Sequence, residues 1–173
     1  AIETSTGPLG QGISVAAGMA LGALLDQKQY YVYTVMSDGE LNEGQCWEAF
    51  MFAAKYKLRN LIVFVDRNHI QIDGRTEEIM PLDPLKDKLQ DFGWHCMSID
   101  GHKIEAIINA VDLAKQVTDG PSAIILNTIP GKGVSFMENK YEWHGKPPSD
   151  KEATEALKQL RTLQGTIDST DIS

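Results

Sequence analysis

The sequence predicts an α/β fold, in which helices flank a parallel β-sheet. Short runs rich in β-branched and aromatic residues alternate with longer segments of helical period, as expected for parallel strands joined by crossover helices. One run, residues 61–65 (LIVFV), is apolar throughout, which is typical of a strand buried on both faces. Because 42% of the 173 residues are hydrophobic, we expect residues 1–173 to form a single compact domain, with a frayed tail at 166–173.

The first half of the chain predicts two strands that each end in polar residues. A glycine-rich turn over residues 7–12 precedes a helix of mostly small residues at 13–25. The strand at 31–36 (YVYTVM) runs into Ser-Asp-Gly. A helix follows at 43–57, because its apolar residues recur at steps of three and four. The apolar strand at 61–65 then ends in Asp-Arg-Asn.

The second half continues the alternation of strands and helices. Pro84 suits the first turn of a short helix within residues 81–93, and Ser149 or Asp150 suits the N-cap of the last helix. The remaining elements are, in order, a strand at 95–99, a helix at 103–117, a strand at 122–127, a glycine- and proline-rich loop at 130–148 and a helix at 150–163.

The composition argues against several functional classes. Asp and Glu total 24 against 16 Lys and Arg, the net charge is −8, and the basic residues form no tract. Nucleic acid and anionic membranes are therefore not expected as partners. No apolar run reaches the ~20 residues of a membrane span, and Cys46 and Cys96 have neither zinc-ligand nor disulfide spacing. We expect a cytoplasmic protein with reduced thiols.

Polar residues after the two predicted strands form a candidate site for a metal-bridged diphosphate. Asp38 follows the first strand and Asn68 the second, and parallel strands present their carboxyl ends to ligands at one edge of a sheet. Carboxylate, amide and carbonyl oxygens are the ligands that Mg²⁺ or Ca²⁺ prefers. Gly39 lets the backbone approach a phosphate oxygen, and the helix that starts near Glu43 offers amides to an anion. A cation here would replace the basic patch that the acidic chain lacks.

The residues around these positions resemble the thiamine diphosphate motif, in the form that it takes in transketolase sequences. The usual motif begins Gly-Asp-Gly and ends in Asn, whereas this chain has Ser37 at the first position. Ser can replace Gly there unless the backbone needs a positive φ. The matching stretches lie at residues 5–12, 37–49, 58–74, 100–102, 132–133 and 143–147.

The resemblance implies a thiamine diphosphate-binding fold and a ligand set for the metal. It implies that Asp38, the Asn68 side chain and the Ile70 carbonyl bind Mg²⁺ or Ca²⁺. Gly39 and Asn68 would also contact the diphosphate of thiamine diphosphate. His102 would either cap the following helix or take part in the site.

The resemblance also implies roles outside the metal site. His144 would touch both the diphosphate and the substrate, which makes it a candidate catalytic residue. Glu43 and Glu48 resemble a pair of acids near a subunit interface, where they would link two active sites through a polar network without performing the carbon–carbon chemistry. Three residues would line the cofactor: Gly7, Pro8 and Leu9.

The function that the resemblance implies is half of a transketolase, which transfers a two-carbon ketol unit from a ketose phosphate to an aldose phosphate. In the family, the glutamate that activates the aminopyrimidine belongs to a pyrimidine-binding half, for which this chain has no candidate. We therefore expect a pyrimidine-binding partner subunit, assembly into a dimer or heterotetramer, and no turnover by this chain alone. The chain starts at Ala1 and opens at once into a glycine-rich turn, so we expect a missing N-terminal segment.

Three alternatives remain open at the level of the sequence. Deoxyxylulose-phosphate synthase and a sulfosugar transketolase would share the cofactor site. A truncated module that keeps the fold without activity is the third.

Overall fold

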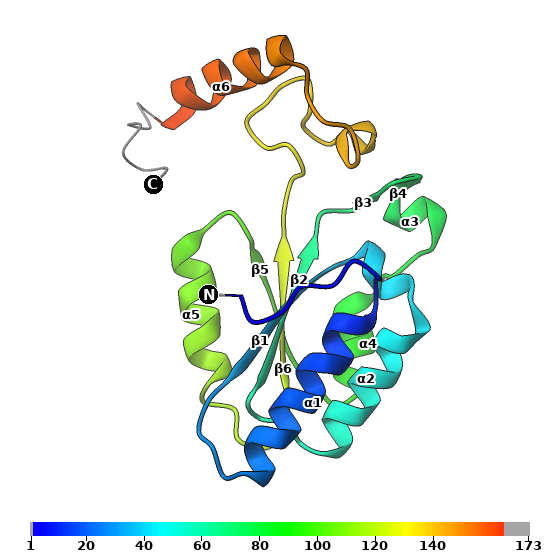
Figure 1. The fold of residues 1–173 in the computed structure, drawn as a ribbon, viewed down its shortest axis with the longest axis vertical. Helices are drawn as coiled ribbons and strands as arrows, with labels where there is room; N and C mark the ends of the chain where they lie inside the picture. The colour runs from blue at the N-terminus through cyan, green and yellow to red at the C-terminus, as the bar shows by residue number, and fades with distance from the viewer. Residues whose placement is uncertain (1, 165–173) are drawn as a thin grey trace. The chain divides into compact units, whose positions relative to one another are not determined.

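The computed structural model describes residues 2–164 and contains a four-stranded parallel sheet (Figure 1). The strand order is β1-β2-β6-β5, and all three neighbouring pairs are parallel. The carboxyl ends of the four strands therefore lie at one edge of the sheet. The strands are β1 (Val32–Ser37), β2 (Leu61–Arg67), β5 (His95–Asp100) and β6 (Ser122–Asn127).

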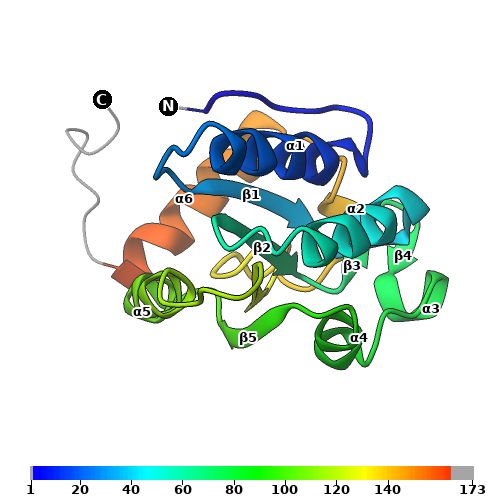
Figure 2. The ribbon, with the colours of Figure 1, turned by 90° about the horizontal axis from the view of Figure 1, so that it is seen from below.

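Helices cover both faces of this sheet, as predicted. Helices α1 (Gln11–Leu25), α2 (Gly44–Lys55) and α4 (Leu85–Asp91) contribute to the larger hydrophobic core. Helix α5 (Ile104–Ala114) packs on the opposite face over a smaller core, and Figure 2 shows α5 and α2 on opposite sides of the sheet. Residues of β2 alternate between these two cores, with Val63 in the larger and Ile62 in the smaller. The apolar run of residues 61–65 is thus a strand buried on both faces.

The chain divides into two compact units. The first contains the sheet and comprises residues up to His69 together with Thr76–Thr128. The second contains residues 70–75 and the chain from Ile129 onward. The prediction of a single domain over residues 1–173 stays a prediction, and its expected frayed tail at 166–173 lies outside the described residues.

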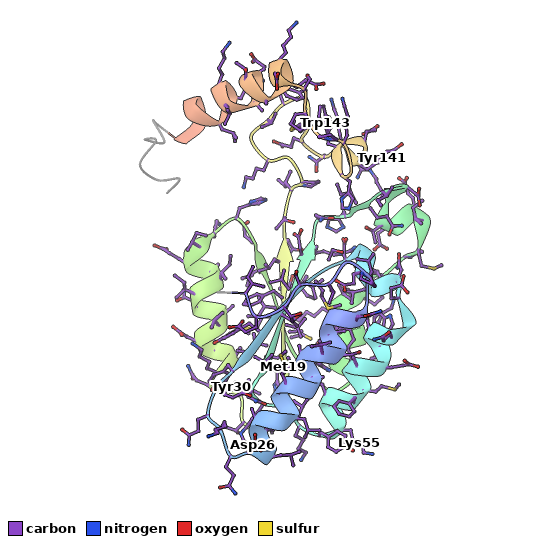
Figure 3. The ribbon with its side chains drawn as sticks, viewed as in Figure 1. Met19, Asp26, Tyr30, Lys55, Tyr141 and Trp143 are labelled. Carbon is purple, nitrogen blue, oxygen red and sulfur yellow. The ribbon has the colours of Figure 1, made fainter. Side chains whose placement is uncertain are left out.

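The second unit is built from short elements and one long helix. Strands β3 (Ile70–Gln71) and β4 (Gly74–Arg75) form an antiparallel pair, and a 3₁₀ turn, η2, precedes helix α6. Figure 3 labels Trp143 of η2. Trp143 donates a hydrogen bond from Nε1 to the Phe136 carbonyl, and Lys146 Nζ lies 4.0 Å from the centre of the Trp143 ring. The bounds of the last two elements are η2 (Tyr141–Trp143) and α6 (Asp150–Gln164).

Capping contacts explain where α6 begins. Ser149 Oγ accepts from the Glu152 amide, while the Glu152 carboxylate accepts from the Ser149 amide at 2.8 Å. This reciprocal pair is a capping box, and it confirms Ser149 as the cap of the helix at Asp150. The Ser149 contacts, followed by the hydrogen bond from Lys146, lower the pKa of the Glu152 carboxyl to about 2.

Several predicted boundaries shift by one or two residues. Strand β2 continues through Asp66 and Arg67, because these residues keep their pairing with β6. Pro84 occupies the N-cap position of α4, one place before the first turn that its fixed φ suits. Three short helical segments have no counterpart in the sequence-based prediction: η1 (Gly39–Asn42), α3 (Thr76–Ile79) and η2. None of the described helices combines the length and the apolar character that crossing a membrane requires.

Candidate metal and diphosphate site

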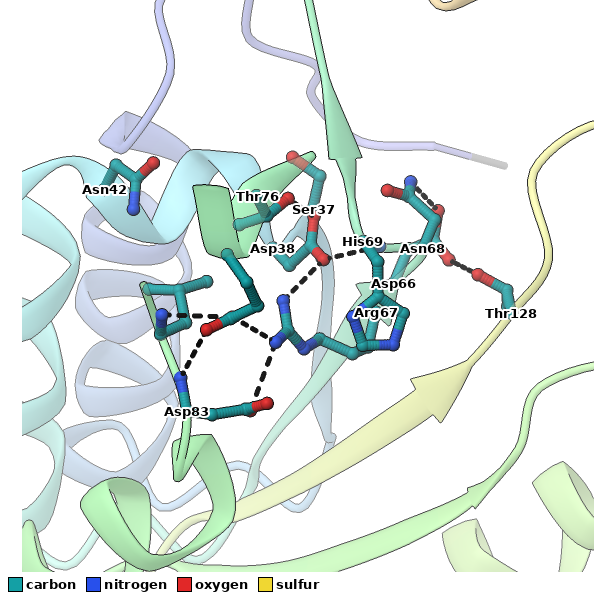
Figure 4. A network of polar contacts seen from close by, with 12 residues as sticks. Ser37, Asp38, Asn42, Asp66, Arg67, Asn68, His69, Thr76, Asp83 and Thr128 are labelled. Carbon is teal, nitrogen blue, oxygen red and sulfur yellow. Dashed lines mark hydrogen bonds and ion pairs between the residues drawn. The ribbon is translucent and has the colours of Figure 1, made fainter. Parts of the chain in front are cut away.

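Asp38 lies directly beyond the carboxyl end of β1 and is fully buried, with a relative exposure of 0%. Its Oδ2 accepts two hydrogen bonds, from Arg67 Nη1 at 2.9 Å and from the His69 amide at 2.8 Å (Figure 4). Its Oδ1 accepts a longer one from Thr76 Oγ1, at 3.4 Å. A buried carboxylate needs such hydrogen-bond partners. The fold therefore holds the Asp38 carboxylate at the edge of the sheet, in the position that the sequence predicts.

Ser37 shows that the departure from the usual Gly-Asp-Gly motif is compatible with the fold. Ser37 is not among the non-glycine residues with positive φ, so glycine is not required there. Its hydroxyl oxygen accepts a hydrogen bond from the Glu40 amide at 3.2 Å, a contact that glycine could not make. The serine thus caps the turn that follows Asp38.

Asn68 lies just beyond the end of β2, the strand that neighbours β1 in the sheet. Its Nδ2 donates to Asp66 Oδ2 at 2.9 Å, and Thr128 Oγ1 donates a short hydrogen bond to the other oxygen of Asp66. Asp66 thereby fixes which way the Asn68 amide is turned, with nitrogen toward the carboxylate. The carbonyl oxygen of Asn68 is then the atom that could ligate a cation.

These donors fit a hard divalent cation better than a soft one. Asp38 supplies a carboxylate and Asn68 an amide oxygen, which are the ligand types of Mg²⁺ and Ca²⁺. Over the part of the chain that the structure describes, no three His, Cys, Asp or Glu side chains gather as they would around zinc. Ile70, the predicted third ligand, belongs to the second unit.

Arg67 is one residue of this site that sequence reasoning missed. It is the last residue of β2 and is 2% exposed. Its Nη1 pairs with Asp38. Its Nη2 pairs with Glu77 through a short hydrogen bond and with Asp83 at 3.1 Å. An Arg in a polar triplet after an apolar strand was the only signal in the sequence, and its acidic partners lie too far along the chain to be matched with it.

The glycine-rich loop before α1 is tied to the Asp38 turn by Glu40, a second residue that sequence reasoning missed. Gly10 has φ +82°, and its amide donates to the buried Glu40 Oε1 at 2.8 Å. A Cβ on Gly10 would lie 2.9 Å from Glu43 Cβ, so the backbone passes close to the start of α2. The three predicted cofactor-lining residues of this loop are exposed: Gly7, Pro8 and Leu9.

The two predicted interface acids are exposed on α2 and its cap. Glu43 is the N-cap residue of α2, so the helix begins one residue later than predicted. Glu48 lines a pocket between α1 and α2, in which Gln45 Nε2 donates to Ser14 Oγ at 3.1 Å. Burial, helped by the charges of Glu40 and Glu43, raises the pKa of the Cys46 thiol to about 12, as expected for an inert thiol.

The histidines divide between the two units. His144 is exposed in the second unit, where its amide donates to the Tyr141 carbonyl at the end of η2. His69 has φ +63° and contributes its backbone to the Asp38 site. His95 pairs with Asp119 on the surface. The amide of His102 donates to Asp100, and Lys103 is the N-cap residue of α5, so His102 does not occupy the cap position.

Comparisons with known proteins place the chain in a family. Residues 1–165 match the family model described as transketolase, thiamine diphosphate binding domain. The chain is 53% identical over 143 residues to the 6-deoxy-6-sulfo-D-fructose transketolase subunit of Clostridium sp. (strain MSTE9), covering 83% of this chain and 52% of that protein. It is 40% identical over 159 residues to an apulose-4-phosphate transketolase subunit of Phocaeicola vulgatus (strain ATCC 8482), covering 92% and 57%.

A solved structure agrees with this assignment. The crystal structure of transketolase from Campylobacter jejuni superposes with a TM-score of 0.85 at 33% sequence identity, covering 91% of this chain and 26% of that one. The chain thus spans only about half the length of the two subunits, at 52% and 57%, and a quarter of the solved transketolase. The chain belongs to the transketolase family and represents its thiamine diphosphate-binding domain.

Proposed function

We propose that this chain supplies the metal–diphosphate anchor of a transketolase. Asp38 and the Asn68 side chain bind Mg²⁺, the Ile70 carbonyl is the third protein ligand, and Gly39 and Asn68 contact the diphosphate. The observation that carries this proposal is the complete burial of the Asp38 carboxylate at the carboxyl end of a parallel strand, with Asn68 at the end of the neighbouring strand. This is the edge at which open parallel sheets bind their ligands.

The activity that follows is transfer of a two-carbon ketol unit from a ketose to an aldose. Bound thiamine diphosphate supplies the nucleophilic carbon for this chemistry, and the protein supplies binding and orientation. The loop at Gly7, Pro8 and Leu9 lines the cofactor, and His144 contacts the diphosphate and the substrate. Glu43 and Glu48 connect two active sites across a subunit interface.

A pyrimidine-binding partner subunit completes the site. Two relatives are themselves named as transketolase subunits, which supports a divided enzyme. The assembly is a dimer or heterotetramer in the cytoplasm, and the isolated chain binds cofactor weakly and turns over no substrate.

The relatives point to two different substrate classes, sugar phosphates and sulfosugars. A sugar phosphate is the substrate class in the general transketolase reaction and in the name of the apulose-4-phosphate relative. The identity of 53% to a 6-deoxy-6-sulfo-D-fructose transketolase subunit favours a sulfosugar donor instead.

The test is calorimetry of the native assembly that contains this chain, titrated with thiamine diphosphate in Mg²⁺ and again in EDTA. We expect binding that requires Mg²⁺ and is lost in Asp38→Asn. Ketol transfer to an aldose acceptor is then assayed with xylulose 5-phosphate and with 6-deoxy-6-sulfofructose as donors. Cofactor binding that ignores EDTA, or robust turnover by the isolated chain, would contradict the proposal.

A further inference from the structure

Arg67 gives the site a feature that the metal ligands alone do not explain. We infer that Arg67 is a positioning residue, which holds the metal ligand Asp38 by one oxygen and couples it to the segment of residues 76–83. The inference rests on the proposed function, because it takes Asp38 to be a metal ligand. It concerns this chain's own contacts, all of which lie within the first unit.

The two oxygens of Asp38 are held differently. Oδ2 receives Arg67 Nη1 at 2.9 Å and the His69 amide at 2.8 Å, whereas Oδ1 receives only the 3.4 Å contact with Thr76 among the hydrogen bonds shown in Figure 4. Arg67 and His69 thus saturate one oxygen and set the plane of the carboxylate. The other oxygen is left with the weaker contact, which a cation could replace as a single-oxygen ligand.

The other terminal nitrogen of Arg67, Nη2, contacts a different part of the chain, residues 77–83. Arg67 Nη2 pairs with Glu77 on α3 and with Asp83 Oδ1 at 3.1 Å. Glu77 in turn accepts from the amides of Leu82, at 3.1 Å, and Asp83, at 3.4 Å. Asp38 is therefore connected to the backbone at residues 82–83 through two side chains, the buried Arg67 and the partly exposed Glu77.

The charges around Arg67 favour a positioning role over one in which Arg67 competes with the metal for Asp38. One guanidinium faces the carboxylates of Asp38, Glu77 and Asp83, so the cluster stays net negative and still attracts a cation. Burial opposes the charges in this cluster. The hydrogen bonds from Arg67 and from the two amides nevertheless lower the pKa of the Glu77 carboxyl. Arg can hold separate carboxylates at the two ends of its rigid planar fork, whereas the compact ammonium of Lys has three donors but no such fixed geometry.

The experiment measures cofactor binding and backbone protection in the native assembly. Calorimetry gives the affinity for thiamine diphosphate with Mg²⁺, and hydrogen exchange gives the protection of the Leu82 and Asp83 amides with and without them. In the wild type we expect bound Mg²⁺ and thiamine diphosphate to raise that protection. Arg67→Met should weaken cofactor affinity on the order of tenfold or more, and the gain in protection should disappear.

Two further variants separate bridging from charge and guard against misfolding. Arg67→Lys keeps the charge. We expect it to bind cofactor more weakly than the wild type and to show little gain in amide protection when the cofactor binds. Glu77→Gln changes a side chain that is 34% exposed, so it should fold, and we expect roughly threefold weaker cofactor binding with reduced coupling. Lys103→Met is the matched control, because it removes the same charge from an exposed pair with Asp100 and should change neither readout.

The outcomes distinguish this inference from the proposed function. If Asp38→Asn abolishes cofactor binding while Arg67→Met or Glu77→Gln leaves affinity and protection at wild-type values, the inference is wrong and the function stands. Tighter binding in Arg67→Met would also overturn it, since Arg67 would then compete with the metal. If Asp38→Asn itself binds normally, the metal site has been misplaced and the proposed function fails.

Discussion

The carboxyl ends of β1 and β2 differ from those of β6 and β5 in the burial and the partners of their polar side chains, although all four ends lie at the same edge of one sheet. Asp38 at the β1 end is fully buried, whereas the Asp100 side chain at the β5 end is 44% exposed. Asp38 is held by groups from two other segments, through Arg67 and Thr76. The Asp100 carboxylate is engaged locally, by the His102 amide two residues away and by Lys103.

The difference teaches that position at the edge of a parallel sheet is not enough to identify a site. Both ends carry an acid, an amide side chain and a glycine. At the β6 end, Asn127 Nδ2 donates to Ser98 Oγ and to the Ile99 carbonyl, so its side chain ties β6 to β5. At the β2 end, Asn68 is turned by a carboxylate and lies outside the strand. Burial of the acid and partners from distant segments distinguish the β1 and β2 end, where we propose the metal site.

The largest expected effect comes from the two acids. Asp38→Asn should lower Mg²⁺-dependent affinity for thiamine diphosphate by more than the ~10–100-fold that outer partners of metal ligands cost. It should also lower the free energy of unfolding by about 3 kcal/mol, because Arg67 loses a buried partner. Asp100→Asn should leave affinity within about twofold and cost less than about 1 kcal/mol. Calorimetry and urea denaturation measure both, and equal losses from the two variants would erase the comparison.

The two asparagines provide the next contrast. Asn68→Ala should weaken cofactor binding by roughly tenfold, since it removes a proposed ligand while Asp38 remains. Asn127→Ala should instead lower stability by about 1–2 kcal/mol through its two lost hydrogen bonds, with cofactor affinity unchanged. Affinity and unfolding are measured on the same preparations. A cofactor defect in Asn127→Ala would extend the site to the β6 end.

Two glycines near these ends, Gly10 in the loop before α1 and Gly101 after β5, extend the comparison to packing. Gly10→Ala should cost about 1–2 kcal/mol, because its φ is +82° and a Cβ would lie 2.9 Å from Glu43 Cβ. Gly101→Ala should cost about 1–3 kcal/mol, because a Cβ would lie 2.6 Å from Thr128 Cγ2. Thermal unfolding should show both losses, but only Gly10→Ala should also weaken cofactor binding, by displacing the loop at Gly7. A cofactor defect of equal size in both would argue for a general effect of instability.

The smallest effect is a dependence of stability on pH. Burial tends to raise the pKa of Glu77, but hydrogen bonds from Arg67 and two amides outweigh it, so this pKa is lowered in the folded protein. The stabilisation by Glu77 is therefore present at neutral pH, above the ordinary Glu pKa of about 4.3, and is lost as the pH falls through the lower folded value. The difference in Tm between the wild type and Glu77→Gln should be largest at neutral pH and should shrink in acid. A difference that stays constant from neutral pH into strong acid would rule out this carboxylate.

Most of the fold could be predicted because its elements are encoded locally. The run at residues 61–65 and the helical period of α2 need no knowledge of distant contacts, and the predicted strand at 122–127 matches β6 residue for residue. The hairpin of β3 and β4 and the turn at Gly39–Asn42 escaped because each is four residues or fewer per element. Such short elements carry too few residues for a periodic signal.

The site was predictable only in part, for a related reason. Asp38 and Asn68 could be placed because each follows a recognisable strand. The roles of Arg67, Glu77 and Glu40 depend on which segments fold against one another, which hydrophobic period does not report. The placement of Ile70 and His144 in the site stays a prediction, as does the interface role of Glu43 and Glu48.

The contacts of Asp38 have a consequence for the order in which the protein matures. Its three partners lie 29, 31 and 38 residues away along the chain, so no short contiguous peptide can hold this carboxylate in place. Long-range pairings of this kind form slowly, since loop closure precedes the gain from contact. The proposed metal site can therefore form only after β1 and β2 have paired. A cofactor that binds there would stabilise folded chains and leave unpaired ones unstabilised.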